Sequence, residues 1–217
     1  MNKTQIEKSI KLLNESKLDE LKQLLMFELL KEDKNKNVKI VDIVKKYLKE
    51  AKNFGNRPML ETVMQKDGKQ FICNGFNLIV FEEYLNELDI LPQTTEDAIN
   101  YKQILCSGLD YKTLTANEID KINDIDNYLK FLKLQHKEQE NRPIMLFNYV
   151  YDANYIKLFK SVFSDLSKVK YGIGRIGTLQ ATDGKVTFLQ LPLRIFEDEA
   201  KQNIETIYNE FLSNKGV

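Results

Sequence analysis

The sequence is poor in the residues that most often carry catalysis or bind metal. Its 217 residues include a single histidine, His136, and two cysteines, Cys73 and Cys106, far apart in the chain. Structural zinc sites need several such ligands close together, and two isolated cysteines make no disulfide framework. We therefore expect no metal site, no disulfide and a reducing cytoplasmic compartment. His136 sits in a charged helical segment, where a solvated position is expected rather than a catalytic base.

Arginine is also scarce, with 28 lysines but only four arginines, and the formal net charge is zero. A neutral chain is not basic overall, although lysines can still gather on one face. Bidentate reading of bases is done best by arginine, so sequence-specific base recognition is disfavoured.

Long apolar runs are absent as well. No segment approaches the ~20 apolar residues that a membrane-spanning helix needs. The N-terminal stretch is polar and lacks the apolar core of a signal peptide, so we expect neither membrane insertion nor export. Hydrophobic content of 42% and charged content of 29% are ordinary for a globular protein of one or two domains.

Helical and strand-like segments alternate in the first part of the chain. Leucines at helical spacing predict one or two helices over 4–32, and Asp42 can cap a helix that ends near Lys52. Val38 and Ile40 alternate with polar residues, which predicts a short strand ahead of that helix. Three strands should follow, at 59–65, 70–73 and 78–81, with the sequence KDGK as the turn of the first hairpin.

The second part of the chain repeats this order after a helical insertion. Residues 83–140 have a helical pattern with breaks near Pro92 and Ser107-Gly108, and Thr115 with Glu118 forms a capping box that opens a long helix. The expected elements are then a strand at 146–151, a helix over 152–166 begun by Asp152, three strands sharing a second Asp-Gly turn at 182–185, and a final helix over 197–212.

Two strand-helix-three-strand units, at about 38–82 and 146–195, together resemble one domain of the bacterial DNA polymerase III beta subunit, the sliding clamp. The first unit carries Asn56-Arg57-Pro58-Met59-Leu60 and Cys73-Asn74-Gly75-Phe76-Asn77-Leu78. The second is similar to the clamp motif at Tyr155 through Lys160 and at Leu189-Gln190-Leu191-Pro192-Leu193-Arg194-Ile195. In the first unit Cys73, Asn74 and Asn77 replace the Thr, Asp and Arg of the clamp pattern. The resemblance covers about 95 of 217 residues.

The resemblance implies an α+β fold with one clamp-like domain. It divides the chain into an N-terminal helical extension at 1–35, a clamp-like domain at 36–196 with a helical insertion at about 83–142, and a C-terminal helix at 197–217. The helices over 42–52 and 153–166 should then pack side by side on one sheet face. A one-domain chain would close a ring only as a homo-oligomer, since rings of this family use six domains.

The resemblance also implies a DNA-facing surface and a client pocket. Clamp helices present basic side chains to phosphate, so the candidate DNA-binding residues are Lys45, Lys46, Lys49, Lys52, Lys157 and Lys160. A solvated helix face is the ordinary alternative for such lysines. The candidate peptide-binding residues are Leu189, Leu191, Pro192, Leu193 and Arg194, with a plain core or edge strand as the alternative. The helix over 197–212 could instead cover that pocket.

Motifs for catalysis or cofactor binding are weak. Residues 172–177, GIGRIG, match G-x-G-x-x-G, but a dinucleotide loop must open a helix and the next residues predict a hairpin. A turn or bulge between strands is the better interpretation. No P-loop or nucleophile elbow is present, so we expect no enzyme and no cofactor.

Two functions remain open at this stage. One is a non-enzymatic, clamp-like replication or processivity factor, of the kind a phage or mobile element would encode, with duplex DNA and a replication-protein peptide as partners. The other is a protein-interaction adaptor that keeps the clamp-like scaffold without binding DNA.

Overall fold

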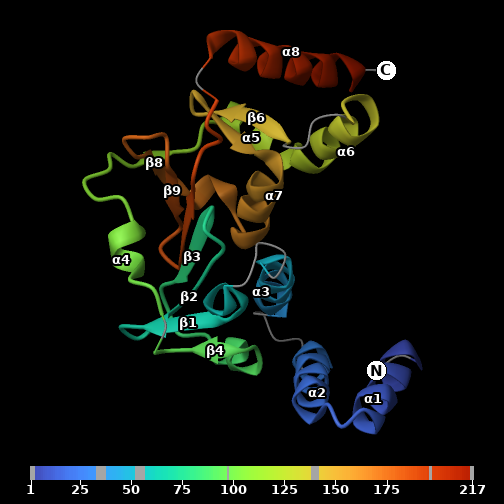
Figure 1. The fold of residues 1–217 in the computed structure, drawn as a ribbon. Helices are drawn as coiled ribbons and strands as arrows, with labels where there is room; N and C mark the ends of the chain where they lie inside the picture. Colours follow the sequence, from blue (N-terminus) through green and yellow to red (C-terminus); the bar gives the residue numbers. More distant parts are fainter. Residues whose placement is uncertain are drawn as a thin grey trace. The chain divides into compact units, whose positions relative to one another are not determined.

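The computed structural model describes residues 3–32, 38–51, 57–96, 98–137, 142–195 and 197–215. The chain divides into two compact units, one made of residues 1–72 with 83–99 and the other of residues 73–82 with 100–217 (Figure 1). Helices and a largely antiparallel sheet occur together, so the α+β class predicted from the sequence is confirmed.

Unit 1 combines a helical N-terminal part with three strands. Its helices are α1 (Lys3–Asn14), α2 (Leu18–Glu32), α3 (Val38–Ala51) and the short 3-10 turns η2 (Pro58–Glu61) and η3 (Asn86–Ile90). Its strands are β1 (Val63–Lys66), β2 (Lys69–Cys73, whose last residue belongs to unit 2) and β4 (Gln93–Thr94). They are ordered β4-β1-β2, with β1 antiparallel to β2 and parallel to β4.

Helix α3 corrects the sequence-based boundary at its start. Val38 and Ile40 were predicted to form a strand, with Asp42 as the helix cap, but both belong to the helix. The apolar stripe explains this, because Val41 and Val44 are both fully buried and Val41 continues the helical spacing upstream of Asp42. No described residue ahead of α3 forms a strand, so this half of the chain has a helix followed by three strands.

The first Asp-Gly hairpin forms as predicted. Lys66 pairs with Lys69, and the two residues between them have positive φ, 54° at Asp67 and 75° at Gly68. That is the turn type whose twist matches a hairpin. The preceding strand is shorter than predicted, because Pro58 holds residues 58–61 in a 3-10 turn and β1 starts only at Val63.

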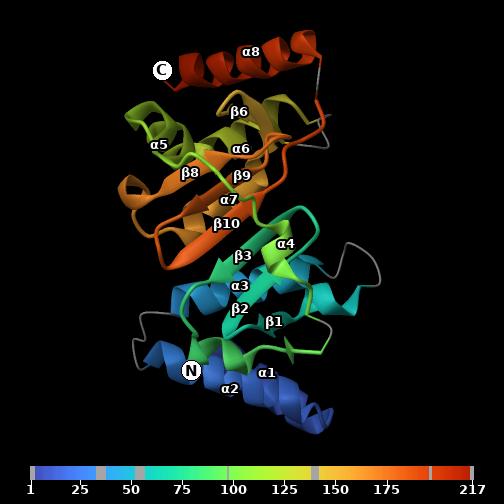
Figure 2. The same cartoon turned by 90° about the vertical axis from the view of Figure 1, so that its left-hand side faces the viewer.

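Unit 2 contains the larger part of the sheet. Its strands are β3 (Asn77–Phe81), β5 (Lys112–Thr113), β6 (Pro143–Leu146), β7 (Tyr149–Asp152), β8 (Lys170–Ile173), β9 (Leu179–Thr182) and β10 (Val186–Gln190). Its helices are α4 (Tyr101–Ile104), α5 (Ala116–Asn123), α6 (Ile125–Gln135), α7 (Ala153–Val162), the 3-10 turn η4 (Leu166–Lys168) and α8 (Asp198–Asn214). The order β3-β10-β9-β8-β5 is antiparallel throughout, and Figure 2 shows its members β3, β10, β9 and β8. Strands β6 and β7 make a separate hairpin.

The strand predicted at 146–151 is wrong, because this segment contains the turn of the β6–β7 hairpin. Phe147 and Asn148 form that turn with φ of 54° and 65°. Positive φ is rare for a bulky residue such as Phe147, so a turn was not predicted at this position. Packing holds the strained residue, since the Phe147 ring centre lies 4.2 Å from that of Tyr171.

The region 83–140 is less helical than predicted. The described residues include η3, α4, α5 and α6, but also β4, β5 and irregular segments. The capping box is confirmed: Thr115 Oγ1 accepts from the Glu118 amide, and the Glu118 carboxylate accepts from the Thr115 amide. The predicted long helix is broken at Asp124, where α5 ends and α6 begins.

Two helices cover the core of unit 2. Asp152 caps α7 as predicted, and the Phe159 ring of α7 lies 5.3 Å from that of Phe188 in β10. The final helix is also confirmed as α8, which packs on α6 and β6 through four buried side chains, Ile204, Ile207, Tyr208 and Phe211 (Figure 2). Each large apolar side chain buried in this way stabilises the fold by about 1.5–3 kcal/mol.

The expected pairing of the two basic helices is not tested. Helix α3 belongs to unit 1 and α7 to unit 2. Their packing side by side on one sheet face therefore stays a prediction.

Candidate functional site

The lysines of α3 differ widely in their surroundings. Lys45 is half-buried, with its Nζ 4.6 Å from the centre of the Phe27 ring of α2, and burial lowers its pKa. Lys46 is exposed and pairs with Asp42 at 2.7 Å, while Lys49 is exposed. Lys45 therefore contacts α2 as well as solvent, and its role in DNA binding stays a prediction. Lys52 lies outside the described residues.

The lysines of α7 are held by the neighbouring helix α6. Lys157 Nζ lies 2.8 Å from one oxygen of Asp126, and Lys160 Nζ lies 2.9 Å from the other. Lys160 also donates to the carbonyl of Asn123 at 2.8 Å. The two ammonium groups lower the pKa of Asp126. A phosphate bound by these two lysines would have to compete with the carboxylate that they share.

The predicted peptide-binding segment lies mostly beyond the last strand. Strand β10 ends at Gln190, and Leu189 within it is 2% exposed, so Leu189 belongs to the core. Beyond the strand, Leu191 is 37% exposed and its amide donates to the carbonyl of Phe76 at 2.9 Å. Leu193 is half-buried and its amide donates to the carbonyl of Val150 at 2.8 Å. The expectation that Leu191 and Leu193 alternate on one strand face is thus wrong.

The turn at 74–77 lies directly beside this segment. Asn74 Oδ1 accepts from the amides of Phe76 and Asn77 at 2.9 and 3.0 Å, which fixes the turn. The Phe76 ring is 49% exposed and stacks against Tyr155 of α7, with ring centres 6.3 Å apart. An aromatic side chain is therefore presented to solvent from a rigid backbone.

The glycine-rich segment forms the loop between β8 and β9, as the hairpin interpretation predicted. The Gly174 amide donates to the Thr178 carbonyl at 2.8 Å, and no helix follows. Gly177 has φ of 81°, and an added Cβ there would lie 2.2 Å from the Tyr149 ring, so only glycine fits. Ile176 at the tip of the loop is 70% exposed.

Strand register brings these segments to one end of the sheet. Gln190 pairs with Asn77 on one side and with Leu179 on the other, and Leu179 pairs with Ile173. The chain before β3, after β10 and between β8 and β9 therefore emerges at the same end. We call the exposed side chains there the end patch; it comprises Phe76, Tyr149, Ile176 and Leu191, with the exposed arginines Arg175 and Arg194.

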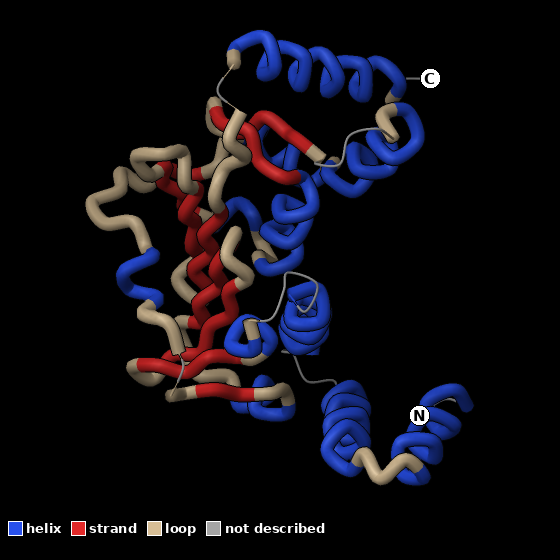
Figure 3. Tube along the Cα trace, viewed as in Figure 1, coloured by secondary structure: helices blue, strands red, loops and turns tan. Residues whose placement is uncertain are grey.

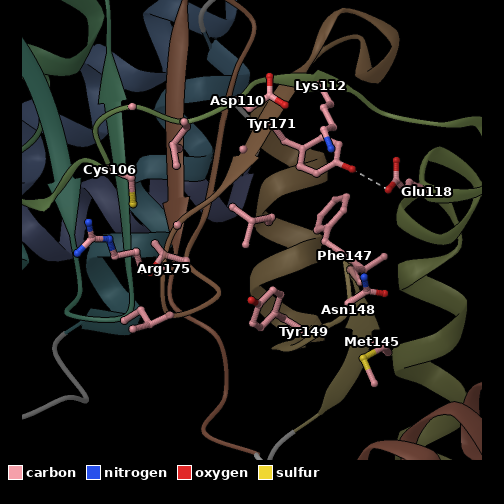
Figure 4. A pocket seen from close by; sticks show the side chains of 18 of the residues that line it. Cys106, Asp110, Lys112, Glu118, Met145, Phe147, Asn148, Tyr149, Tyr171 and Arg175 are labelled. Carbon is pink, nitrogen blue, oxygen red and sulfur yellow. Dashed lines mark hydrogen bonds between the residues drawn. The ribbon is translucent and has the colours of Figure 1, made fainter.

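A groove of about 1470 Å³ adjoins the end patch along β8 (Figure 4). Tyr149, Arg175 and Ile176 line both features. Among the lining residues, the Tyr171 hydroxyl donates to Glu118 at 3.0 Å, and burial together with Glu118 raises the pKa of Tyr171 to about 12. The charged lining residues balance in sign, with Asp110, Glu118 and Glu205 against Lys112, Lys121 and Arg175.

The groove has no activated cysteine among its lining residues. Burial raises the pKa of the Cys106 thiol, so this lining cysteine is not activated as a nucleophile. Across the part of the chain that the structure describes, no three His, Cys, Asp or Glu side chains gather as metal ligands.

His136 is less solvated than predicted, since its side chain is 20% exposed and lies 3.4 Å from Glu210.

Comparisons with known proteins give no relative: no family model, curated protein or solved structure matches the chain. None of the described helices is long and apolar enough to cross a membrane.

Sequence reasoning found part of the end patch. It singled out the segment after β10 and the glycine loop, but it missed Phe76, Tyr149 and Ile176 as exposed side chains. The available signal was a large apolar residue inside or next to a turn, where solvent exposure is common.

Proposed function

We propose that this chain is a non-enzymatic protein-binding module whose end patch takes a short extended peptide with apolar anchors. The observation that supports this proposal most strongly is the hydrogen bond from the Leu191 amide to the Phe76 carbonyl. This bond holds two exposed apolar side chains beside each other. A rigid apolar surface binds without the entropic cost of ordering it first.

The dimensions of the end patch suit an extended peptide. The patch crosses four neighbouring strands, β3, β10, β9 and β8, spaced about 4.8 Å apart, which gives a width of about 14 Å. An extended chain covers that distance in about four or five residues. Two of the four arginines in the sequence, Arg175 and Arg194, belong to the patch. They favour an acidic side chain or a terminal carboxylate next to the anchors.

A buried polar group supports the same location. Gln190 is fully buried at the end of β10, and its Oε1 has no hydrogen-bond partner among the described residues. An unsatisfied buried acceptor costs roughly 1–3 kcal/mol, so a ligand group that donates to it would be favoured at this end of the sheet.

Selection from a displayed library of random short peptides tests the proposal. We expect the parent chain to enrich peptides with two large apolar residues and an acidic group, and Leu191→Asp to lose them. Leu191 is 37% exposed and outside any strand, so the variant should melt close to the parent. Leu134→Asp, at a residue 68% exposed on α6, is the matched control and should enrich the same peptides as the parent. Equal enrichment by Leu191→Asp would contradict the proposal.

Tethering to duplex DNA on a clamp-like scaffold is the second candidate. Two features favour it: the helix-and-three-strand order α3-β1-β2-β3, repeated as α7-β8-β9-β10, and the exposed Lys46 and Lys49 on α3. The contacts of Lys45, Lys157 and Lys160 within the chain weaken it, so we rank it below peptide binding.

A further inference from the structure

The N-terminal helix α1 leaves a row of aliphatic side chains in solvent. Ile6, Ile10 and Leu13 are 48%, 53% and 56% exposed. Their spacing of four and then three residues puts them on one helix face. The neighbouring face is the one that packs, since Leu12 is buried and Gln5 donates to Glu28 of α2 at 2.6 Å.

Helix α2 carries a matching row. Leu18, Leu25 and Leu29 are 62%, 43% and 61% exposed, and steps of seven and four residues align them on one face. The buried side of α2 is again the adjacent one, because Leu24 is 8% exposed and Glu28 is 7% exposed.

The two rows lie on the same side of the helical hairpin. Gln5, near the start of α1, contacts Glu28, near the end of α2, so the helices run antiparallel (Figure 3). In both helices the residues of the exposed row come one position later in the sequence than residues that pack between the helices. One position corresponds to a rotation of about 100° around the helix axis. For antiparallel helices the same rotation moves both rows to the same side. The six residues therefore form one face, which we call the hairpin face.

We propose that the hairpin face is a dimerisation surface, on which the α1–α2 hairpins of two copies of this chain pack into a four-helix bundle. A two-helix hairpin cannot bury such a face alone, and a bundle of four helices is the ordinary way to bury it. This surface belongs to unit 1 and is independent of the end patch in unit 2.

Charges beside the hairpin face favour a second copy over other partners. Helix α1 carries Glu7 and Lys11 there, and α2 carries Asp19 and Lys22. Both signs occur on both helices, so a two-fold interface can set opposite charges against each other. Nucleic acid or an anionic membrane surface would instead call for a predominance of lysine.

The size of the hairpin face determines how stable the proposed dimer should be. At 1.5 Å per residue the helices are about 20 Å long, and two of them side by side are about 20 Å wide, which gives on the order of 400 Å² per copy. Stable interfaces bury about 800 Å² per partner. We therefore expect a dimer that dissociates on dilution rather than a permanent one.

Light scattering coupled to size-exclusion chromatography of the full chain over a wide concentration range tests this proposal. The parent should move from the 25.4 kDa of one chain toward twice that mass as its concentration rises. The double variant Ile10→Glu with Leu25→Glu should stay at the mass of one chain. The double variant Leu13→Lys with Leu29→Lys, of opposite charge, should behave in the same way, which excludes a defect peculiar to one substitution.

The matched control is Leu134→Glu, an exposed aliphatic residue of α6, which should follow the parent. Circular dichroism should show unchanged helix content in all variants, because glutamate and lysine are good helix formers. A parent that stays at one chain mass throughout, or charged variants that still dimerise, overturns the proposal.

Discussion

The Lys45 side chain connects two helices through its contact with Phe27. Lys31 also places its Nζ 4.4 Å from the centre of that ring, so two ammonium groups share one aromatic ring. Burial, and then the positive charges of Lys8 and Lys31, lower the pKa of Lys45. The residue therefore has a structural role within unit 1, which its position in a lysine-rich helix did not reveal.

Charge reversal at Lys45 should reduce stability, whereas reversal at Lys49 should not. Lys45→Glu loses a half-buried cation–π contact, and we expect a loss of about 1 kcal/mol in the free energy of unfolding. Lys49→Glu, on the same helix but exposed, is the control and should change it by less than ~0.5 kcal/mol. Urea unfolding followed by circular dichroism measures both, and equal midpoints for the two variants would contradict the contact.

The burial of Lys45 and the nearby charges of Lys8 and Lys31 predict a pH dependence at the alkaline end. A lysine with a lowered pKa binds its proton less well in the folded chain than at the ordinary value of 10.5. The free energy of unfolding should therefore rise as pH increases from the lowered pKa of Lys45 toward 10.5. Lys45→Met should lack this rise.

At the level of single elements, the caps and turns with a local chemical signal were predictable. The Thr115–Glu118 box, the Asp152 cap and both Asp-Gly turns formed where the sequence placed them. Elements held by tertiary contacts were missed. The turn at Phe147 depends on stacking with Tyr171, and the end of β10 at Gln190 depends on hydrogen bonds from 191 and 193 to distant segments.

The N-cap of α7 should be sensitive to loss of its acceptor but not of its charge. Asp152 accepts from the Asn154 amide at 2.8 Å, and burial raises its pKa. Asp152→Ala should lower the free energy of unfolding by about 1 kcal/mol, while Asp152→Asn keeps the acceptor and should stay near the parent. Because the pKa is raised in the folded chain, the parent should lose stability as pH rises from the ordinary 3.8 through the raised value, and Asp152→Asn should not. Thermal melts across that pH range check both statements.

The contact between α6 and α7 offers a test of the tethering candidate. Asp126→Asn removes the carboxylate that Lys157 and Lys160 share. Asp19→Asn changes the net charge equally on exposed α2 and is the control. If the chain binds peptides rather than DNA, releasing these lysines from Asp126 should not increase its affinity for DNA. We therefore expect the two variants to bind duplex DNA alike in a low-salt titration. A several-fold gain for Asp126→Asn alone, with a steeper salt dependence, would instead support phosphate contact by α7.

At the scale of the whole molecule, short strands cover one edge of the strands in each unit, and this affects whether copies of the chain can form a ring. In unit 1 the two-residue strand β4 pairs along β1, and in unit 2 the two-residue strand β5 pairs along β8. Short covering strands of this kind block edge-to-edge association. They come from the segment 83–142, which has no counterpart in the clamp resemblance. This arrangement favours an adaptor over a closed ring built by strand pairing.

The α+β class and the order of most strands were predictable because hydrophobic periodicity and turn residues are local properties. The end patch was only partly predictable. Its exposed residues are brought together by the pairing of Gln190 with Asn77 and Leu179, which are distant in sequence. Which lysines are free of contacts within the chain also depends on packing, as Lys45 and Lys160 illustrate.

Methyl-detected NMR of the full chain, titrated with a peptide enriched by the parent, tests the central claim most directly. The account predicts shift changes at the methyl groups of Leu191, Leu193 and Ile176, and none at Ile6, Ile10 or Leu25 of the hairpin face. Shift changes confined to the hairpin face, or spread evenly without a maximum at the end patch, would contradict it.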